Sequence, residues 1–125
     1  MGYRTQRINE IIKERLSGLI ERELKDPRLD KAVISITRTQ TTPDTKYCKV
    51  FVSIYGKDVD KKEIISVLDK AKGFLRKQIS RNLPTKNTPE LIFILDESMD
   101  YALHIEEVLK GLDIKPEENE DEQQY

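Results

Sequence analysis

Cysteine is almost absent from this 125-residue sequence: Cys48 stands alone, so no disulfide can form within the chain. No apolar run approaches the length of about 18 residues that a membrane span requires. The first ten residues are polar and lack the apolar stretch of a signal peptide. We therefore expect a cytoplasmic protein with no membrane partner.

Signs of catalysis are also scarce. The single histidine, His104, and Cys48 fall on separate predicted elements, so no nucleophile–base pair is indicated. We expect His104 on the surface and Cys48 in the core as a small apolar side chain. Metal-ligand spacing, a phosphate-binding loop and a dinucleotide fingerprint are missing too. The acidic cluster of Asp96, Glu97 and Asp100 lies at a predicted helix start, where it would complement the helix dipole. We expect no enzyme, metal, cofactor or small-molecule substrate, and a small hydrolase whose site the sequence does not reveal is a further alternative.

Charge is plentiful but unevenly placed. The net charge is −1, yet residues 1–95 hold 20 basic and 12 acidic residues, and residues 96–125 hold 2 and 11. A basic body suits a polyanionic partner. Residues 113–125 are acidic with almost no apolar content, which predicts a disordered tail. We therefore predict one domain over residues 1–112 followed by this tail.

Apolar periodicity predicts an α+β domain. A hairpin turn, TTPDT, separates the first two strands, and Asp60 with Glu63 has the spacing of a capping box. Ser98 or a neighbour is the predicted cap of the last helix. The predicted elements are a helix over Thr5–Leu24, strands over Val33–Thr39 and Lys46–Tyr55, a helix from Asp60 to about Asn82, a strand over Leu91–Leu95, and a final helix ending near Gly111. This order predicts a three-stranded sheet with helices on one face and an added C-terminal helix.

The second long helix contains an unusual basic stretch. Gly73 lies on its polar face, where glycine costs about 1 kcal/mol relative to alanine. It is either tolerated on a solvated surface, or it breaks the helix or lets a phosphate–sugar backbone approach closely, and the last two can both be true. A helix restarting at Gly73 would direct N–H groups at an anion. The segment from Lys70 to Pro89 contains six basic residues and no acid, and this imbalance favours nucleic-acid binding. The six are Lys70, Lys72, Arg76, Lys77, Arg81 and Lys86.

Two further groups have competing interpretations. Arg4 and Arg7 open the first helix, where cations oppose the dipole, so RNA contact is one explanation for them. Tyr47, Phe51 and Tyr55 form an aromatic stripe on one face of the second strand. The stripe either stacks on bases or packs internally, across strands or beneath the last helix, and we favour internal packing.

Several short motifs, taken in order, resemble the ribosome-binding factor A family of bacterial small-subunit assembly factors. The resemblance covers about residues 4–112, and its strongest pair is ELKDPRL at Glu23–Leu29 with PEL-x-F at Pro89–Phe93. Within the first of these motifs we expect Asp26 to pair locally in a turn. The other motifs are Arg7-Ile8, Ala71-Lys72-Gly73 followed by Phe74-Leu75-Arg76, and Asp96-x-Ser98 followed by Ile105 and Leu109.

The resemblance implies a type II KH-like fold, in the order α-β-β-α-(Ala-x-Gly kink)-α-β. KH domains grip single-stranded nucleic acid through a GXXG loop. Glycines occur here only at positions 2, 18, 56, 73 and 111, so no GXXG exists. In this family the kink, here Ala71, Lys72 and Gly73, stands in that place. The usual KH grip therefore cannot be assumed.

The resemblance also implies a function. We expect a monomeric, non-enzymatic factor that binds the free small (30S) ribosomal subunit and its rRNA, supports late maturation and rRNA end processing, and matters most in the cold. The alternative is a protein-interaction module whose basic face docks an acidic protein. The predicted RNA-binding residues are Arg4, Arg7, Lys70, Lys72, Gly73, Arg76, Lys77, Arg81 and Lys86.

Overall fold

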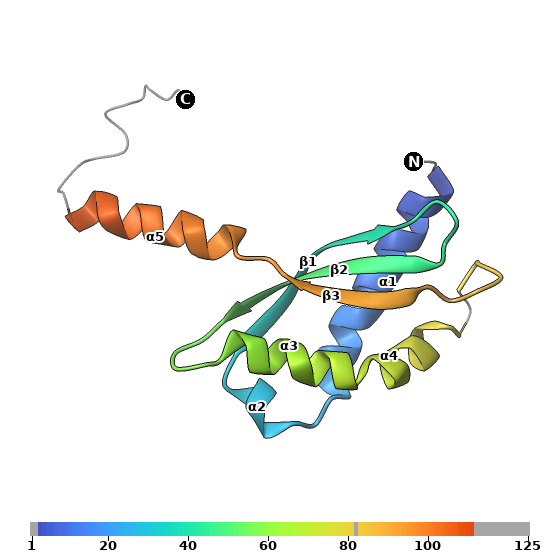
Figure 1. Ribbon diagram of the computed structural model, residues 1–125, viewed down its shortest axis with the longest axis horizontal. Coiled ribbons are helices and arrows are strands. Elements are labelled where there is room, and N and C mark those ends of the chain that lie inside the picture. Colours follow the sequence, from blue (N-terminus) through green and yellow to red (C-terminus); the bar gives the residue numbers. More distant parts are fainter. Residues whose placement is uncertain (1–2, 82, 112–125) are drawn as a thin grey trace.

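The computed structural model describes residues 3–81 and 83–111, which form five helices and a three-stranded sheet. Figure 1 shows their arrangement. In chain order they are α1 (Tyr3–Arg22), α2 (Pro27–Asp30), β1 (Val33–Thr41), β2 (Tyr47–Tyr55), α3 (Lys61–Lys70), α4 (Lys72–Ile79), β3 (Glu90–Leu95) and α5 (Ser98–Gly111).

The sheet has the strand order β1-β2-β3. β1 and β2 are antiparallel, as expected for a hairpin, with a bulge between Ile36 and Arg38. β2 and β3 are parallel, which requires a long crossover, and α3 with α4 provides it. The predicted α+β fold, with its α-β-β-α-α-β order and added last helix, is confirmed.

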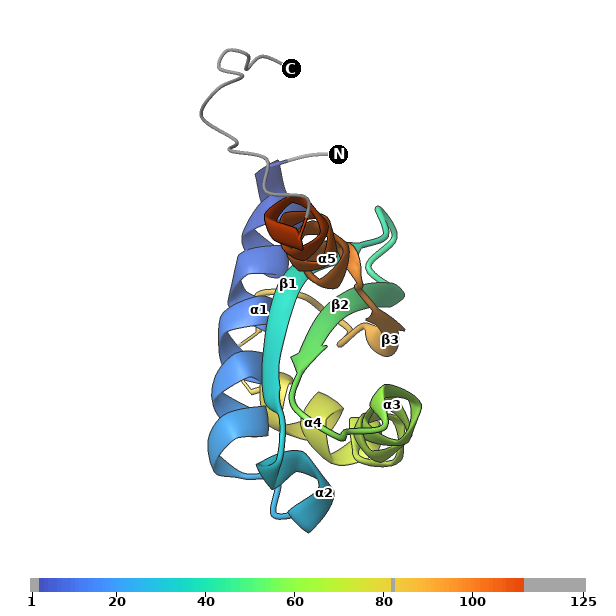
Figure 2. The same ribbon diagram turned by 90° about the vertical axis from the view of Figure 1, so that its left-hand side faces the viewer.

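One face of the sheet carries the core. Alternate residues of β2, from Cys48 to Ile54, are buried, while their neighbours face outward or are half-buried. Opposite them pack Ile8, Ile12 and Leu16 of α1 and Leu68 and Leu75 of the crossover helices, all fully buried. Figure 2 shows α1, α3 and α4 around this side of the sheet. Full burial of one such side chain contributes about 1.5–3 kcal/mol.

Two carboxylates start helices, one of them at the predicted place. Asp60 accepts hydrogen bonds from the backbone N–H groups of Lys62 and Glu63, so it caps α3. Asp26 caps α2, a four-residue helix that we did not predict, and pairs with the Arg28 guanidinium at 2.8 Å. Hydrogen bonds from the Arg28 side chain lower the pKa of Asp26 to about 2. The expected local pairing is confirmed, although the segment is a short helix.

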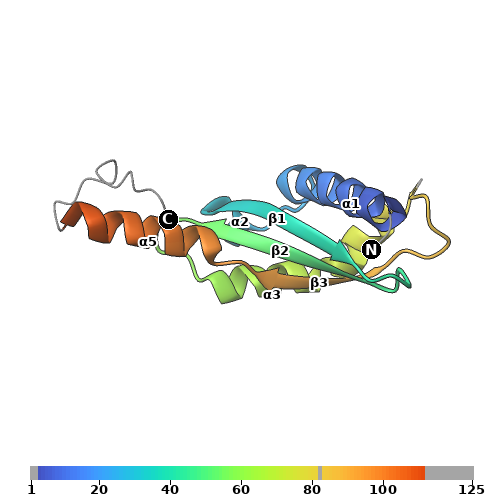
Figure 3. The same ribbon diagram turned by 90° about the horizontal axis from the view of Figure 1, so that it is seen from above.

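The last helix does not cover the sheet. Figures 1 and 3 show α5 leading away from the end of β3, at the end of the molecule opposite to α4. Of the two forms of internal packing that we considered for the aromatic stripe, packing beneath this helix does not occur, because Tyr47 and Tyr55 remain 45% and 62% exposed. Phe51 does pack across strands, since the Arg38 guanidinium lies 4.0 Å from its ring centroid. The predicted tail, residues 113–125, and the predicted domain end at residue 112 lie outside the described residues.

Asp96 sets the start of α5. Its carboxylate accepts a hydrogen bond from the Thr37 hydroxyl at 2.6 Å and from the Ser98 N–H at 3.0 Å. Its own N–H donates to the carbonyl oxygen of Val52. These bonds lower the pKa of Asp96 to about 2, with the Thr37 hydroxyl as the largest cause. The carboxylate thus joins α5 to the bulged part of β1.

Candidate nucleic-acid interface

Helices α3 and α4 meet at Ala71, which ends the first and precedes the second. Its backbone N–H donates to the carbonyl oxygens of Val67 and Leu68, both at 3.1 Å, and its φ and ψ angles are −90° and −1°. α4 begins at Lys72 without a side-chain cap from the described residues, because the preceding alanine has no acceptor on its side chain. The second helix therefore restarts one residue earlier than the expected Gly73.

Gly73 faces open space. A Cβ atom placed on it would meet no heavy atom of the surrounding described chain within 4 Å. Its φ angle is not positive, so the backbone conformation does not require glycine either. Neither packing nor backbone geometry within the described residues explains this glycine. Its effect is to leave the backbone at position 73 open to a molecule that approaches from outside, between the exposed side chains of Lys72 and Phe74.

A basic hollow lies directly beside this glycine. Its volume is about 370 Å³. Side chains from α4 meet the loop before β3 here, and the basic ones are Arg76, Lys77 and Lys86, with no acid among the lining residues. The other lining residues are Gly73, Ser80, Asn87 and Thr88. We call this group of seven residues the basic hollow. Three unbalanced cations on one concave surface are a physical basis for binding a polyanion.

Arg76 shapes the basic hollow and also contributes to its positive charge. Its Nε and Nη2 atoms donate hydrogen bonds to the carbonyl oxygen of Thr88, at 3.1 and 2.7 Å. These bonds hold the loop that carries Lys86 against α4. Leu75, adjacent in sequence, points the other way and is fully buried. The amphipathic pattern of α4 thus presents Arg76 and Lys77 outward from a helix that the core holds in place.

The other predicted cations lie outside the basic hollow. Lys70 lines a separate depression, together with Asp26 and Arg28, on the far side of the break. Lys72 is exposed on the first turn of α4. The carbonyl oxygen of Arg81 accepts a hydrogen bond from the Arg15 guanidinium of α1, which also donates to Ile79. This contact joins α1 to the end of α4.

Arg4 and Arg7 are exposed on the first two turns of α1. Figures 1 and 3 place the start of α1 at the same end of the molecule as the loop between α4 and β3. Arg7 lines a depression of mixed charge that includes Glu10 and Glu14. The two arginines therefore share the basic end of the molecule without entering the basic hollow.

Sequence reasoning missed Ser80, Asn87 and Thr88. They are uncharged and belong to no recognised motif, so no local signal identified them. Their role follows from the fold, because the loop before β3 turns back over α4. The carbonyl oxygen of Thr88 is the clearest example, since it positions Arg76 through a backbone atom that any residue would supply.

Cys48 and His104 lie where we expected. Cys48 is fully buried, which raises the pKa of its thiol, and His104 is exposed on α5. Within residues 3–81 and 83–111, no group of three or more histidine, cysteine, aspartate or glutamate residues is arranged to hold a metal ion. None of the helices in this part of the chain is long and apolar enough to cross a membrane.

Comparison with known proteins agrees with this architecture. The family model described as ribosome-binding factor A matches residues 4–109. The ribosome-binding factor A of Caldanaerobacter subterraneus is 45% identical over 112 residues, covering 90% of this chain and 91% of the relative. That of Clostridium kluyveri is 43% identical over 108 residues, covering 86% and 88%.

Solved structures are similar as well. The crystal structure of ribosome-binding factor A from Thermus thermophilus has a TM-score of 0.62 at 20% identity, covering 73% of this chain and 94% of that one. A homology model of the Thermus thermophilus factor, fitted into an electron-microscopy map of its 30S complex, gives a TM-score of 0.56 at 16% identity, covering 78% of this chain and 97% of that one. At these identities the likeness establishes the fold alone.

Proposed function

The chain belongs to the ribosome-binding factor A family, and from this premise we propose that it binds the free small ribosomal subunit and its rRNA. A homology model of a Thermus factor with this fold has been fitted into the electron-microscopy map of its 30S complex. The observation that carries the proposal to particular residues is the basic hollow, where Arg76, Lys77 and Lys86 gather without an acid beside Gly73, whose surroundings are open.

Phosphate neutralisation supplies the affinity. Each lysine or arginine that meets a phosphate releases condensed counterions, so binding gains free energy with little dependence on base sequence. Gly73 lets a backbone approach the N-terminal end of α4, where the helix dipole favours an anion. We assign direct contact with rRNA phosphates to the basic hollow. The other predicted cations add to the positive potential around it: Arg4, Arg7, Lys70, Lys72 and Arg81. Specificity comes from the shape of incompletely folded rRNA.

The chemical step of rRNA maturation belongs to other proteins. We propose that this chain is a non-enzymatic, monomeric factor acting in the cytoplasm, where it supports late small-subunit maturation and rRNA end processing. Its importance is greatest in the cold. Cells without it should accumulate small-subunit rRNA with unprocessed ends, more so at low temperature, and primer extension on that rRNA measures this. Equal end processing with and without the protein would contradict this part of the proposal.

Co-sedimentation tests the main claim. Wild-type protein should travel with free small subunits, but not with large subunits or whole ribosomes, and increasing salt should release it. The variant Lys77→Glu with Lys86→Glu should lose this binding. A matched variant, Lys57→Glu with Lys62→Glu, makes the same charge change outside the hollow and should still bind. Equal binding by both variants would refute the assignment of the hollow.

Extracted rRNA separates RNA binding from the alternative of an acidic protein partner. If the hollow contacts RNA, protein-free small-subunit rRNA should retain binding that is sensitive to the Lys77 and Lys86 changes. Binding that needs the subunit's proteins, and that has only a shallow dependence on salt, would favour the alternative.

A further inference from the structure

The two halves of β1 differ in what lies along their outer edge. β1 is the outer strand of the sheet, and an outer strand presents N–H and C=O groups with no neighbouring strand. Along its second half α1 supplies partners: the Asn9 side chain accepts from the N–H of Thr41 at 2.8 Å, and Lys13 Nζ donates to the carbonyl oxygen of Thr37 at 3.5 Å. Along its first half, Val33–Ile36, the strand borders a pocket instead.

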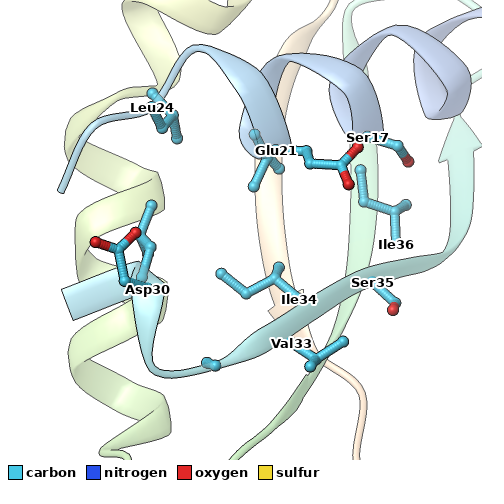
Figure 4. A pocket seen from close by; sticks show the side chains of 11 residues that line it. Ser17, Glu21, Leu24, Asp30, Val33, Ile34, Ser35 and Ile36 are labelled. Atoms are coloured by element: carbon cyan, nitrogen blue, oxygen red, sulfur yellow. The ribbon is translucent and has the colours of Figure 1, made fainter. Parts of the chain in front are cut away.

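This pocket is a groove of about 530 Å³ between the second half of α1, α2 and the start of β1. Figure 4 shows α1 on one side of it and β1 on the other. The apolar residues that line it include Ile20 of α1, Leu24 just after α1, Leu29 of α2, and Ile34 and Ile36 of β1, and of these Ile20, Leu29 and Ile36 are largely buried. Val33 at the rim is 64% exposed. A strip of strand edge with a trough beside it that is partly apolar and partly polar has the shape needed to take an extended peptide.

The charge of the groove is opposite to that of the basic hollow. Glu21 and Asp30 are the charged residues among those that line it, and both are exposed. Asp30 of α2 lies toward one end of the groove, and Glu21 of α1 lies farther from that end (Figure 4). Two carboxylates disfavour RNA, and also the chain's own acidic residues 113–125. They favour a segment rich in lysine or arginine. We call this site the acidic groove.

We infer that the acidic groove binds an extended basic segment of a partner protein, added to the edge of β1 as a further strand. Because alternate residues of an antiparallel strand face its partner, Ile34 and Ile36 would supply the backbone hydrogen bonds, while Val33 and Ser35 bond to β2. At about 3.3 Å per residue, four residues of strand edge match a segment of about 13 Å. Alternate side chains of the segment would enter the trough, and its cations would face Glu21 and Asp30. This inference does not depend on RNA binding at the hollow, which uses other elements.

A synthetic nine-residue peptide of alternating lysine and valine, labelled with fluorescein, is a suitable probe. Fluorescence anisotropy on the full chain should show saturable binding, and ¹⁵N NMR should place the largest shifts at residues 33–36. Glu21→Gln with Asp30→Asn should weaken binding by about tenfold, which corresponds to about 1.4 kcal/mol. The matched variant Glu10→Gln with Asp69→Asn changes two exposed acids outside the groove and should bind as the wild type does.

Two altered peptides test the mode of binding. N-methylation of alternate backbone nitrogens removes strand hydrogen bonds and should abolish binding, and replacing every lysine by glutamate should do the same. Undiminished binding of either peptide, or NMR shifts away from residues 33–36, would overturn the inference. Concentration-dependent shifts at these residues without peptide would identify a second copy of the chain as the occupant and would also overturn it.

Discussion

The salt dependence of small-subunit binding gives a quantitative test of the basic hollow. Arg76, Lys77 and Lys86 line it, but Arg76 also holds the loop through Thr88, so we leave Arg76 unchanged. The perturbation is Lys77→Ala with Lys86→Ala. Both side chains are exposed, and removing them should leave the fold intact.

The expected magnitude follows from counterion release. Each phosphate contact contributes about −0.7 to −0.9 to the slope of log K against log salt, so losing two contacts should make the slope shallower by about 1.4 to 1.8. Three contacts together weaken binding about 20- to 40-fold between 50 and 200 mM salt, whereas one weakens it only about threefold. The difference between variant and wild type is informative even if the surrounding cations add to both slopes.

Fluorescence anisotropy of labelled protein with purified small subunits, over this salt range, measures the two slopes. The control variant Lys57→Ala with Lys62→Ala removes two cations at the opposite end and should keep the wild-type slope. A double variant in the hollow whose slope equals that of the wild type would refute the claim that Lys77 and Lys86 meet phosphates.

Other predictions concern stability and geometry. Leu75→Ala should lower the free energy of unfolding by about 2–5 kcal/mol, because the side chain is fully buried; an unchanged urea midpoint would contradict this. Gly73→Ala should stabilise α4 by up to about 1 kcal/mol, since the added methyl meets open space, yet weaken subunit binding if RNA approaches that backbone. Thermal unfolding and anisotropy separate the two effects, and unchanged binding would remove the glycine from the contact. Asp96 should titrate at about pH 2 by NMR, and Thr37→Val should raise its pKa toward the ordinary 3.8. Because the folded pKa is depressed, the stability that Asp96 contributes is complete above pH 3.8 and is lost as pH falls through about 2; a titration near 3.8 in the wild type would refute it.

Local patterns were sufficient where one residue decides one structural feature. Asp60 predicted the start of α3, because a carboxylate at that position accepts from the first free N–H groups of a helix. The alternation of β2 predicted which of its faces is buried. Asp26-Pro27 carried a helix-start signal that we interpreted as a turn, although aspartate as cap and proline at the first helical position are typical of a helix.

Contacts between distant segments could not be predicted in this way. The sequence favoured internal packing of the aromatic stripe, but the direction of α5, which Asp96 and Thr37 help to set, leaves Tyr47 and Tyr55 exposed. The same holds for the two proposed sites. The basic hollow forms because the loop that carries Lys86 folds over α4. The acidic groove forms because α1 and α2 leave a space beside the start of β1.

By itself, the sequence determined the kinds of element, their order, the buried faces and the excess of positive charge between Lys70 and Pro89. These depend on residue type and on spacing within a few turns of chain. The tertiary structure alone decided which cations share a concave surface, which half of an edge strand stays open, and where α5 points. Those outcomes depend on contacts between residues far apart in sequence, such as Arg76 with Thr88 and Thr37 with Asp96.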